Sequence, residues 1–378
     1  MTLFRAPAYK SGSAWSAVKH WKETSEILGR IVAEGEAGRR AAVATVVRIQ
    51  GSAYRRPGAR LLVEEDGRTC GSVSGGCLEA DVRETALDVV RARAPRLIHY
   101  DTGSDDRIVW GLGLGCNGSV DIFVQEATAT KFLEVARRAR ELLEGDSPFV
   151  LSTVLKGPSA GCAVLTVGAG HASGSTGDAA LDLAVGAEAA EALSRRASRI
   201  AELSSADVFH EWLAPPPHLV LFGAGDDAIA ICRYASDAGF RVTVVDHRRA
   251  YLSAERFPAA ARLLLRRAEE GLASLPAGPR DFGVVKTHSF GQDREWTRQL
   301  LSSGIAYIGL LGPRARAAEI IRQLGASDSG RVHGPVGLDL GAEGPEQVAV
   351  AIVAELLAVR SGREPLPLRE KEGAIHAG

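Results

Sequence analysis

The strongest structural signal in this chain is a strand followed by a glycine turn, His218-Leu-Val-Leu-Phe222 and then Gly223-Ala-Gly225-Asp-Asp-Ala228. In dinucleotide-binding units the first glycine permits a tight turn, and the second lets a phosphate approach the backbone. The small third residue packs the helix on the sheet. Asp246 ends the next expected strand, where a ribose-binding carboxylate belongs. The pattern predicts a Rossmann-like unit with Gly223, Gly225 and Asp246 as candidate cofactor-binding residues.

After Pro217 strands and helices alternate along the chain, which indicates a doubly wound parallel sheet over residues 215–362. Strands are expected at 218–222, 241–246, 262–265, 282–287 and 306–310, with helices at 226–238, 293–302, 313–324 and 345–360. His288 follows one strand and Arg314 opens the helix after another, so both are candidate ligand contacts at the carboxyl edge of the sheet. Asp226 and Asp227 in the first helical turn either cap the helix or repel a pyrophosphate.

The preceding residues predict a different architecture, an α+β domain over 13–126 and a connecting segment over 127–214. Helices are expected near 16–35, 78–91 and 132–143, and strands at 42–49, 60–65, 97–100, 120–125, 149–155 and 163–167. Residues 168–174 resemble a nucleotide loop, but no helical pattern follows directly, which favours a hairpin or surface loop. No internal repeat is evident. Pro215-Pro-Pro217 marks the main domain boundary, and residues 1–12 and 363–378 form tails.

Two loops of this first domain combine cysteine with glycine, Gly75-Gly76-Cys77-Leu78-Glu79 and Gly113-Leu-Gly-Cys116-Asn117-Gly118. Where a loop enters a helix, exposed backbone N–H groups lower the pKa of a thiol and attract anions. Soft thiolates suit soft or sulfur-bearing metal centres. Gly75, Gly76, Cys77, Cys116 and Asn117 are therefore candidate cofactor-binding residues, and the two cysteines are candidate metal ligands. Cys70, Cys162 and Cys232 fit the ordinary role of small buried side chains.

The composition excludes several classes of protein. The 378 residues carry 45 Lys and Arg against 46 Asp and Glu, so no bulk positive charge favours nucleic acid. No apolar run reaches the roughly 18 residues of a membrane span, and the first residues lack the layout of a signal peptide. No C-x-x-C or His–Cys cluster suggests structural zinc, and no acid–base pair or nucleophilic triad indicates a catalytic site. We expect a cytoplasmic protein with reduced thiols.

Taken together, the motifs resemble the xanthine dehydrogenase accessory protein family, of the XdhC and CoxI type. The resemblance rests on the strings 71–79, 115–118, 223–225, 245–248, 287–288, 307–312 and 334–341, in this order. It implies a maturation factor that binds a molybdopterin-type molybdenum cofactor as cargo and supports its sulfuration. The cargo would then be inserted into a molybdenum hydroxylase apoenzyme, such as xanthine or carbon monoxide dehydrogenase. A cysteine desulfurase would be a second partner, and homodimers are common. The family usually has His where this chain has Asp226.

Two other functions fit parts of the sequence. A nicotinamide-dependent oxidoreductase would use NAD(P) at Gly223–Ala228 and Asp246, although it leaves the cysteine–glycine loops unexplained. A scaffold between a desulfurase and a dehydrogenase would bind both proteins without any small molecule. The cofactor-insertion chaperone accounts for both halves of the chain and is therefore preferred over an enzyme.

Overall fold

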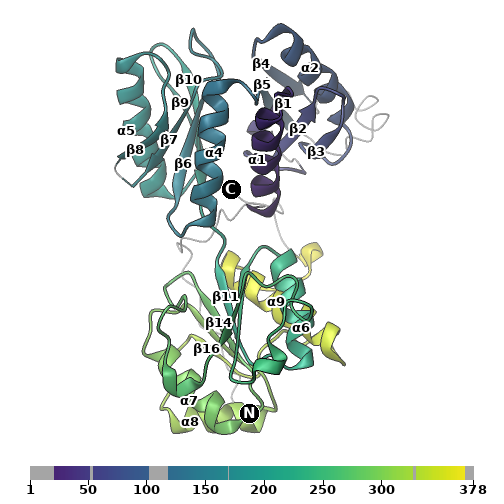
Figure 1. Ribbon diagram of the computed structural model, residues 1–378, viewed down its shortest axis with the longest axis vertical. Helices are drawn as coiled ribbons and strands as arrows, with labels where there is room; N and C mark the ends of the chain where they lie inside the picture. Colours follow the sequence, from purple (N-terminus) through teal and green to yellow (C-terminus); the bar gives the residue numbers. More distant parts are fainter. Residues whose placement is uncertain (1–20, 52–53, 102–117, 169, 327–328, 371–378) are drawn as a thin grey trace. The chain divides into compact units, whose positions relative to one another are not determined.

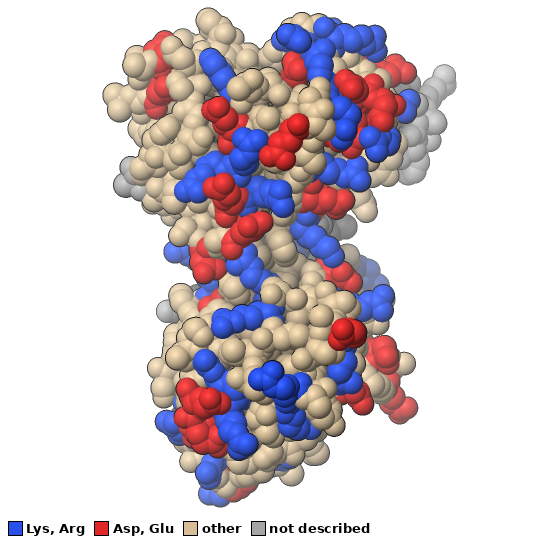
Figure 2. Space-filling view, viewed as in Figure 1, with Lys and Arg blue, Asp and Glu red and all other residues tan. Residues whose placement is uncertain are grey.

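The computed structural model describes residues 21–51, 54–101, 118–168, 170–326 and 329–370. These residues divide into an N-terminal unit, which ends at Pro215, and a C-terminal unit, which begins at Pro216 (Figure 1). Positive and negative side chains are interspersed on the face of each unit seen in Figure 2. Among the described residues, no helix has both the length and the apolar character needed to cross a membrane.

The first half of the N-terminal unit folds as a helix, three strands, a second helix and two strands in the described residues. These are α1 (Trp21–Glu36), β1 (Ala41–Gly51), β2 (Arg60–Glu64), β3 (Thr69–Gly71), α2 (Glu79–Ala92), β4 (Arg96–Asp101) and β5 (Gly118–Glu126). The strands form an antiparallel sheet in the order β3-β2-β1-β5-β4. Val82, Ala86 and Val89 of α2 pack on it in one apolar cluster, as the helical spacing of these residues predicts.

The second half repeats the same succession of elements. They are α4 (Thr130–Glu144), β6 (Phe149–Val154), β7 (Ala163–Val167), β8 (Gly170–Gly174), α5 (Ala179–Arg195), β9 (Arg199–Glu202) and β10 (Asp207–Leu213). Their antiparallel sheet has the order β8-β7-β6-β10-β9, which is the order of the first sheet strand for strand. The N-terminal unit is thus a repeated α-β-β-β-α-β-β module, here called the first and second copy.

Two sequence expectations are settled by this second copy. The prediction that the chain has no internal repeat was wrong. The repeat lies in the order and pairing of the helices and strands, while most side chains of the two copies differ. The preference for a hairpin at residues 168–174 is confirmed, since β7 and β8 pair there as antiparallel neighbours. The helix α5 was missed.

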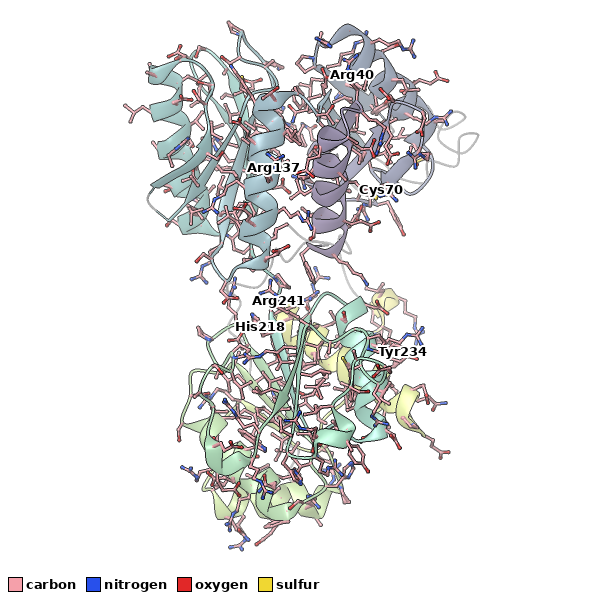
Figure 3. All side chains as sticks on the ribbon, in the orientation of Figure 1. Arg40, Cys70, Arg137, His218, Tyr234 and Arg241 are labelled. Atoms are coloured by element: carbon pink, nitrogen blue, oxygen red, sulfur yellow. The ribbon has the colours of Figure 1, made fainter. Side chains whose placement is uncertain are left out.

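The two copies pack through their equivalent first helices, α1 and α4. One apolar cluster combines residues of both copies, among them Ile27 and Ile31 of α1 with Val135 and Ala139 of α4. Arg137 on α4 points toward α1 (Figure 3), where its guanidinium lies 3.2 Å from the Glu36 carboxylate. The two copies therefore share an apolar core where these helices meet, in addition to the cluster that each copy has of its own.

The C-terminal unit is a six-stranded parallel sheet in the order β13-β12-β11-β14-β15-β16. Its strands are β11 (His218–Phe222), β12 (Arg241–Asp246), β13 (Arg262–Leu265), β14 (Phe282–Val285), β15 (Tyr307–Leu310) and β16 (Val332–His333). Its α-helices are α6 (Asp226–Asp237), α7 (Phe290–Leu301), α8 (Arg314–Gln323) and α9 (Pro345–Ser361), and the short 3-10 helices are η1 (Arg249–Tyr251), η2 (Ala268–Glu270) and η3 (Leu368–Glu370).

Helices cover both faces of this sheet, with α6 and α9 in one apolar cluster and α7 and α8 in another. The chain order reverses between β11 and β14, so the carboxyl ends of these two strands form the switch point where such sheets bind ligands. The prediction of an α/β protein with an N-terminal α+β region and a C-terminal Rossmann-like doubly wound sheet is confirmed.

Candidate functional site

The Cys77 loop connects β3 to α2 and is built around the carboxylate of Glu79. This carboxylate accepts six hydrogen bonds, from the backbone N–H groups of Val73, Ser74, Gly75 and Gly76 and from the hydroxyl groups of Ser72 and Ser74. Burial alone would raise the pKa of Glu79, but these donors hold it well below its usual range. Glu79 therefore stays ionised and fixes the loop.

Within this fixed loop the thiol side chain of Cys77 is exposed. Gly75 and Gly76 precede it with φ angles of 116° and 121°, which favour glycine. A β-carbon at Gly75 would lie 2.8 Å from the ring of Tyr54, whereas Gly76 faces open space. The backbone N–H groups that the sequence assigned to the thiol or to an anion are thus bound by Glu79, and the loop presents Cys77 outward.

The second copy contains an equivalent loop that is fixed by a carboxylate but has no thiol. Gly71, Ser72 and Glu79 of the first copy correspond in order and spacing to Gly174, Ser175 and Asp182. Asp182 accepts hydrogen bonds from the Ser175 hydroxyl and from the Thr176 N–H, both at 2.7 Å. Both glycines have positive φ, at 89° and 85°. A β-carbon there would lie 2.3 or 2.1 Å from a backbone oxygen of the neighbouring strand.

The two copies differ where the following helix begins. In the second copy α5 begins at Ala179, three residues before Asp182, whereas in the first copy α2 begins at Glu79 itself. By this correspondence Cys77 occupies the place of Ala180, which lies inside the first turn of α5. The fold therefore accommodates a helical turn at this position, and in the first copy Gly75 and Gly76 replace that turn with a loop that exposes a thiol.

The structure describes the three other cysteines but only part of the second cysteine–glycine loop. Cys116 and Asn117 lie outside the described residues. Cys232 is 1% exposed in α6, and burial raises the pKa of its thiol to about 12. Burial also raises the pKa of Cys70. Within the described part of the chain no three His, Cys, Asp or Glu side chains are grouped as a metal site. Of the two cysteines predicted as metal ligands, the structure therefore describes Cys77 alone, and no further ligands are grouped around it there.

At the carboxyl edge of the Rossmann sheet, Asp246 stabilises the glycine turn from within. Its carboxylate accepts hydrogen bonds from the Ala224 N–H at 2.7 Å and from the Arg248 N–H at 2.8 Å. The Arg248 guanidinium donates to both of its oxygens, and the side chain is 2% exposed. Burial opposes ionisation, but the Arg248 and Ala224 donors lower the pKa of Asp246 to about 2. Asp246 thus fixes the turn, rather than offering a free carboxylate to a ribose.

A second charged pair lies beside the same glycine turn, and the sequence did not predict it. The ammonium of Lys286, directly after β14, is fully buried and forms an ion pair with Asp227 in the first turn of α6. His288 lies beside them, with its Nε2 3.5 Å from the second oxygen of Asp227. Gly223 is required here, because a β-carbon would lie 2.5 Å from the Lys286 carbonyl oxygen. The one available signal was a lysine directly after a buried apolar strand.

The other charged groups at this edge have their own partners. Asp226 pairs with Arg256 at 2.8 Å. Asp293 accepts hydrogen bonds from the backbone and hydroxyl of Thr287 and pairs with Arg316. The predicted Arg314 is exposed at the start of α8, without an ion pair among the described residues. The structure thus brings Gly223, Gly225, Asp246 and His288 together around the switch point and places Arg314 after β15, the strand next to β14.

Comparison with known proteins identifies both halves of the chain. A family model for the XdhC Rossmann domain matches residues 219–356, and a model for the XdhC and CoxI family matches residues 35–101. A Bacillus subtilis protein that is named as a probable component of xanthine dehydrogenase is 35% identical over 324 residues, which are 85% of this chain and 93% of that protein.

Two further matches agree with this. The Escherichia coli "Molybdenum cofactor insertion chaperone PaoD" is 37% identical over 106 residues, which are 28% of this chain and 32% of that protein. A crystal structure described as a xanthine dehydrogenase from Bacillus halodurans matches with a TM-score of 0.75 and 27% identity. It covers 90% of this chain and 96% of that one. With both family models matched and a relative of 35% identity that is covered to 93% of its length, the chain belongs to the XdhC and CoxI family.

Proposed function

We propose that this protein binds a molybdenum cofactor and supports its insertion into a molybdenum hydroxylase of the xanthine dehydrogenase type. Family membership and the similarity to a molybdenum cofactor insertion chaperone support the class of function. The observation that carries the proposal in this chain is the exposed Cys77 at the place where the second copy has the helical residue Ala180.

The chemistry of the loop suits such a cargo. A molybdopterin-type cofactor carries a soft, sulfur-bound metal and an anionic phosphate, and a cysteine thiolate is a suitable soft ligand. Gly76 faces open space, so a bulky ligand can approach the backbone beside Cys77. Because Glu79 fixes the loop before any ligand arrives, little ordering is needed on binding. Cys116 and Asn117 remain a second proposed thiol loop.

The test is cofactor uptake by the full chain under anaerobic conditions. Purified protein is incubated with molybdenum cofactor released from a molybdenum enzyme, and bound molybdenum and pterin are measured after gel filtration. We expect saturable binding by the wild type, a loss of at least about tenfold in affinity in Cys77→Ala, and no change in the matched control Cys70→Ala. If Cys77→Ala, Cys116→Ala and the double variant all bind like the wild type, the thiol part of the proposal is wrong.

Delivery is a separate step with its own partners. We propose that the loaded protein transfers cofactor to a molybdenum hydroxylase apoenzyme, that a cysteine desulfurase supplies the terminal sulfur, and that the chaperone acts as a homodimer in the cytoplasm. Reconstitution of apo-xanthine dehydrogenase with the loaded protein, with and without a desulfurase, measures both interactions. If free cofactor activates the apoenzyme as well as loaded protein does, the delivery role is wrong.

A further inference from the structure

The buried ion pair between Lys286 and Asp227 is an unusual feature of the C-terminal unit. The Lys286 side chain has no exposed surface, while that of Asp227 is 24% exposed. Burying an ammonium is unfavourable, and a buried ion pair often stabilises a protein no better than well-packed apolar side chains would. Stability alone therefore does not account for a lysine here, and its place at the switch point between β11 and β14 points to a ligand.

Three polar groups converge on the backbone of Gly225. A β-carbon at this residue would lie 3.0 Å from Oδ1 of Asp227, 3.5 Å from Nζ of Lys286 and 3.6 Å from Nε2 of His288. The φ angle of Gly225 is −61°, so the backbone does not require glycine there. A side chain here would crowd these groups at the second position of the glycine turn, where phosphates approach the backbone.

The backbone of His288 is held in a strained conformation at the same place. Its φ angle is 60°, in the left-handed region that side chains with a β-carbon rarely adopt. Such strain persists where the surrounding structure imposes it, and it is concentrated at functional sites. The imidazole is 67% exposed and faces Asp227. His288 can therefore contact both Asp227 and a molecule arriving from solvent.

Several basic groups at this edge are paired with carboxylates. Among the described residues, Arg256 and Arg316 pair with Asp226 and Asp293, and Arg248 pairs with Asp246, which also lies 3.6 Å from Nδ1 of His247. Lys286 and His288 share the carboxylate of Asp227. Because this carboxylate contacts both groups, it can leave the ammonium and still pair with the imidazole.

We propose that a phosphate group of a ligand binds over Gly225 and pairs with Lys286, and that Asp227 is the internal counter-ion which this phosphate displaces toward His288. When no ligand is present, Asp227 compensates the buried ammonium. When the phosphate takes that place, the Asp227 carboxylate pairs with His288. This inference deepens the proposed function and rests on it, since it assigns a receptor for the phosphate of the cofactor.

The test is binding of inorganic pyrophosphate to the full chain by calorimetry at constant ionic strength. Asp227→Asn removes the competing charge but keeps the size of the side chain, so we expect it to bind pyrophosphate at least about tenfold more tightly than the wild type. Lys286→Met is expected to abolish that binding. Glu319→Gln, which removes one negative charge from the surface of α8, is the control and should differ from the wild type by less than about twofold.

The gain of affinity in Asp227→Asn protects the test against misfolding, because an unfolded variant would not bind more tightly. Equal or weaker binding by Asp227→Asn overturns the inference, as does wild-type binding in a folded Lys286→Met protein. A gain in pyrophosphate affinity together with no molybdenum cofactor uptake by the wild type would support the phosphate receptor and contradict the proposed function. Normal molybdenum cofactor uptake by the wild type, without a gain in pyrophosphate affinity in Asp227→Asn, would support the proposed function and contradict the phosphate receptor.

Discussion

Arg60 on β2 and Glu211 on β10 form an ion pair between the two copies of the N-terminal unit. Their side chains are only 6% and 1% exposed. Arg60 also donates to the Gly58 carbonyl oxygen at 3.0 Å, which fixes its direction. Since elements of the two copies pack in a common apolar cluster, this pair adds a buried charged contact to a joint that also contains the exposed Arg137–Glu36 pair.

Removing one partner of this pair should strongly destabilise the N-terminal unit. Arg60→Met leaves the Glu211 carboxylate buried without its guanidinium, and we expect a loss of about 3 to 5 kcal/mol in the free energy of unfolding. The double variant Arg60→Met with Glu211→Leu should recover most of that loss, because no uncompensated charge remains. Urea unfolding measures both. A single variant that loses less than about 1 kcal/mol would show that the pair is well solvated.

His210 should make the stability of the N-terminal unit depend on pH. It has no exposed surface, and its burial, with the charge of Arg199 adding, lowers the pKa of the imidazole to about 4. The stabilisation by neutral His210 is fully present above the unfolded pKa of about 6.5 and decreases as the pH falls toward 4.

The expected decrease is about 3 kcal/mol in the free energy of unfolding. His210→Gln cannot be protonated in this range and should reduce the dependence by that amount, measured as the difference between variant and wild type in urea at pH 7 and pH 4. Parallel pH profiles for the two proteins would contradict the assignment.

Glu79 should stabilise the Cys77 loop more than its counterpart Asp182 stabilises the second copy. Glu79→Gln places an amide among N–H and O–H donors, and we expect a loss of about 2 to 3 kcal/mol. Asp182→Asn, which loses fewer hydrogen bonds, should lose about half of that. Because folding lowers the pKa of Glu79, its stabilisation is present above about pH 4.5 and is lost as the pH falls below that value. A Glu79→Gln effect that is equal at pH 7 and pH 3 would contradict this.

The loop of the second copy should replace the Cys77 loop without unfolding the protein. A variant with Thr-Gly-Asp-Ala-Ala at residues 73–77, taken from 176–180, keeps Ser72 and Glu79 at the same spacing. We expect a folded protein with a melting temperature within a few degrees of the wild type, and loss of cofactor uptake. Retained uptake would show that the exposed thiol is dispensable. Circular dichroism and molybdenum analysis give the two measurements.

NAD should stabilise the C-terminal unit no more than inorganic pyrophosphate does. Because Asp246 already binds Arg248 and the Ala224 N–H, no free carboxylate is left for a ribose hydroxyl. A ligand present at 100 times its dissociation constant stabilises a protein by about 2.7 kcal/mol, so millimolar NAD would reveal even moderate binding as a rise in melting temperature. A rise several degrees larger than the one that pyrophosphate gives would restore the oxidoreductase hypothesis.

The sequence predicted most strands of the C-terminal unit because the four central ones are buried along almost their whole length, whereas the edge strand β13 is partly exposed. Strands at 218–222, 241–246 and 262–265 match the structure residue for residue. Continuous apolar runs bounded by glycine and charged residues are a clear signal for parallel strands. In contrast, α5 lies in a stretch rich in Ala, Gly and Ser, where Gly186 and weak amphipathic patterning conceal the helix.

Features of the candidate sites could be predicted only where a residue and its neighbours in the sequence indicate them. The exposure of Cys77 follows from its adjacent glycines. The ion pair of Lys286 joins residues 59 positions apart in the chain, and its significance appears only when β11 and β14 are adjacent. The roles of Glu79 and Asp246 were also hidden, because a sequence shows that a carboxylate is present but does not show which donors surround it in the folded protein.

The two copies of the N-terminal unit also point to how it arose. Equivalent helices α1 and α4 meet across a common core, as the two halves of a symmetric dimer do. Duplication and fusion of one ancestral gene, whose product once paired with itself, is the simplest origin of such a unit. From such an origin the two loops diverged, so that the second copy has a turn of helix where the first has an exposed thiol.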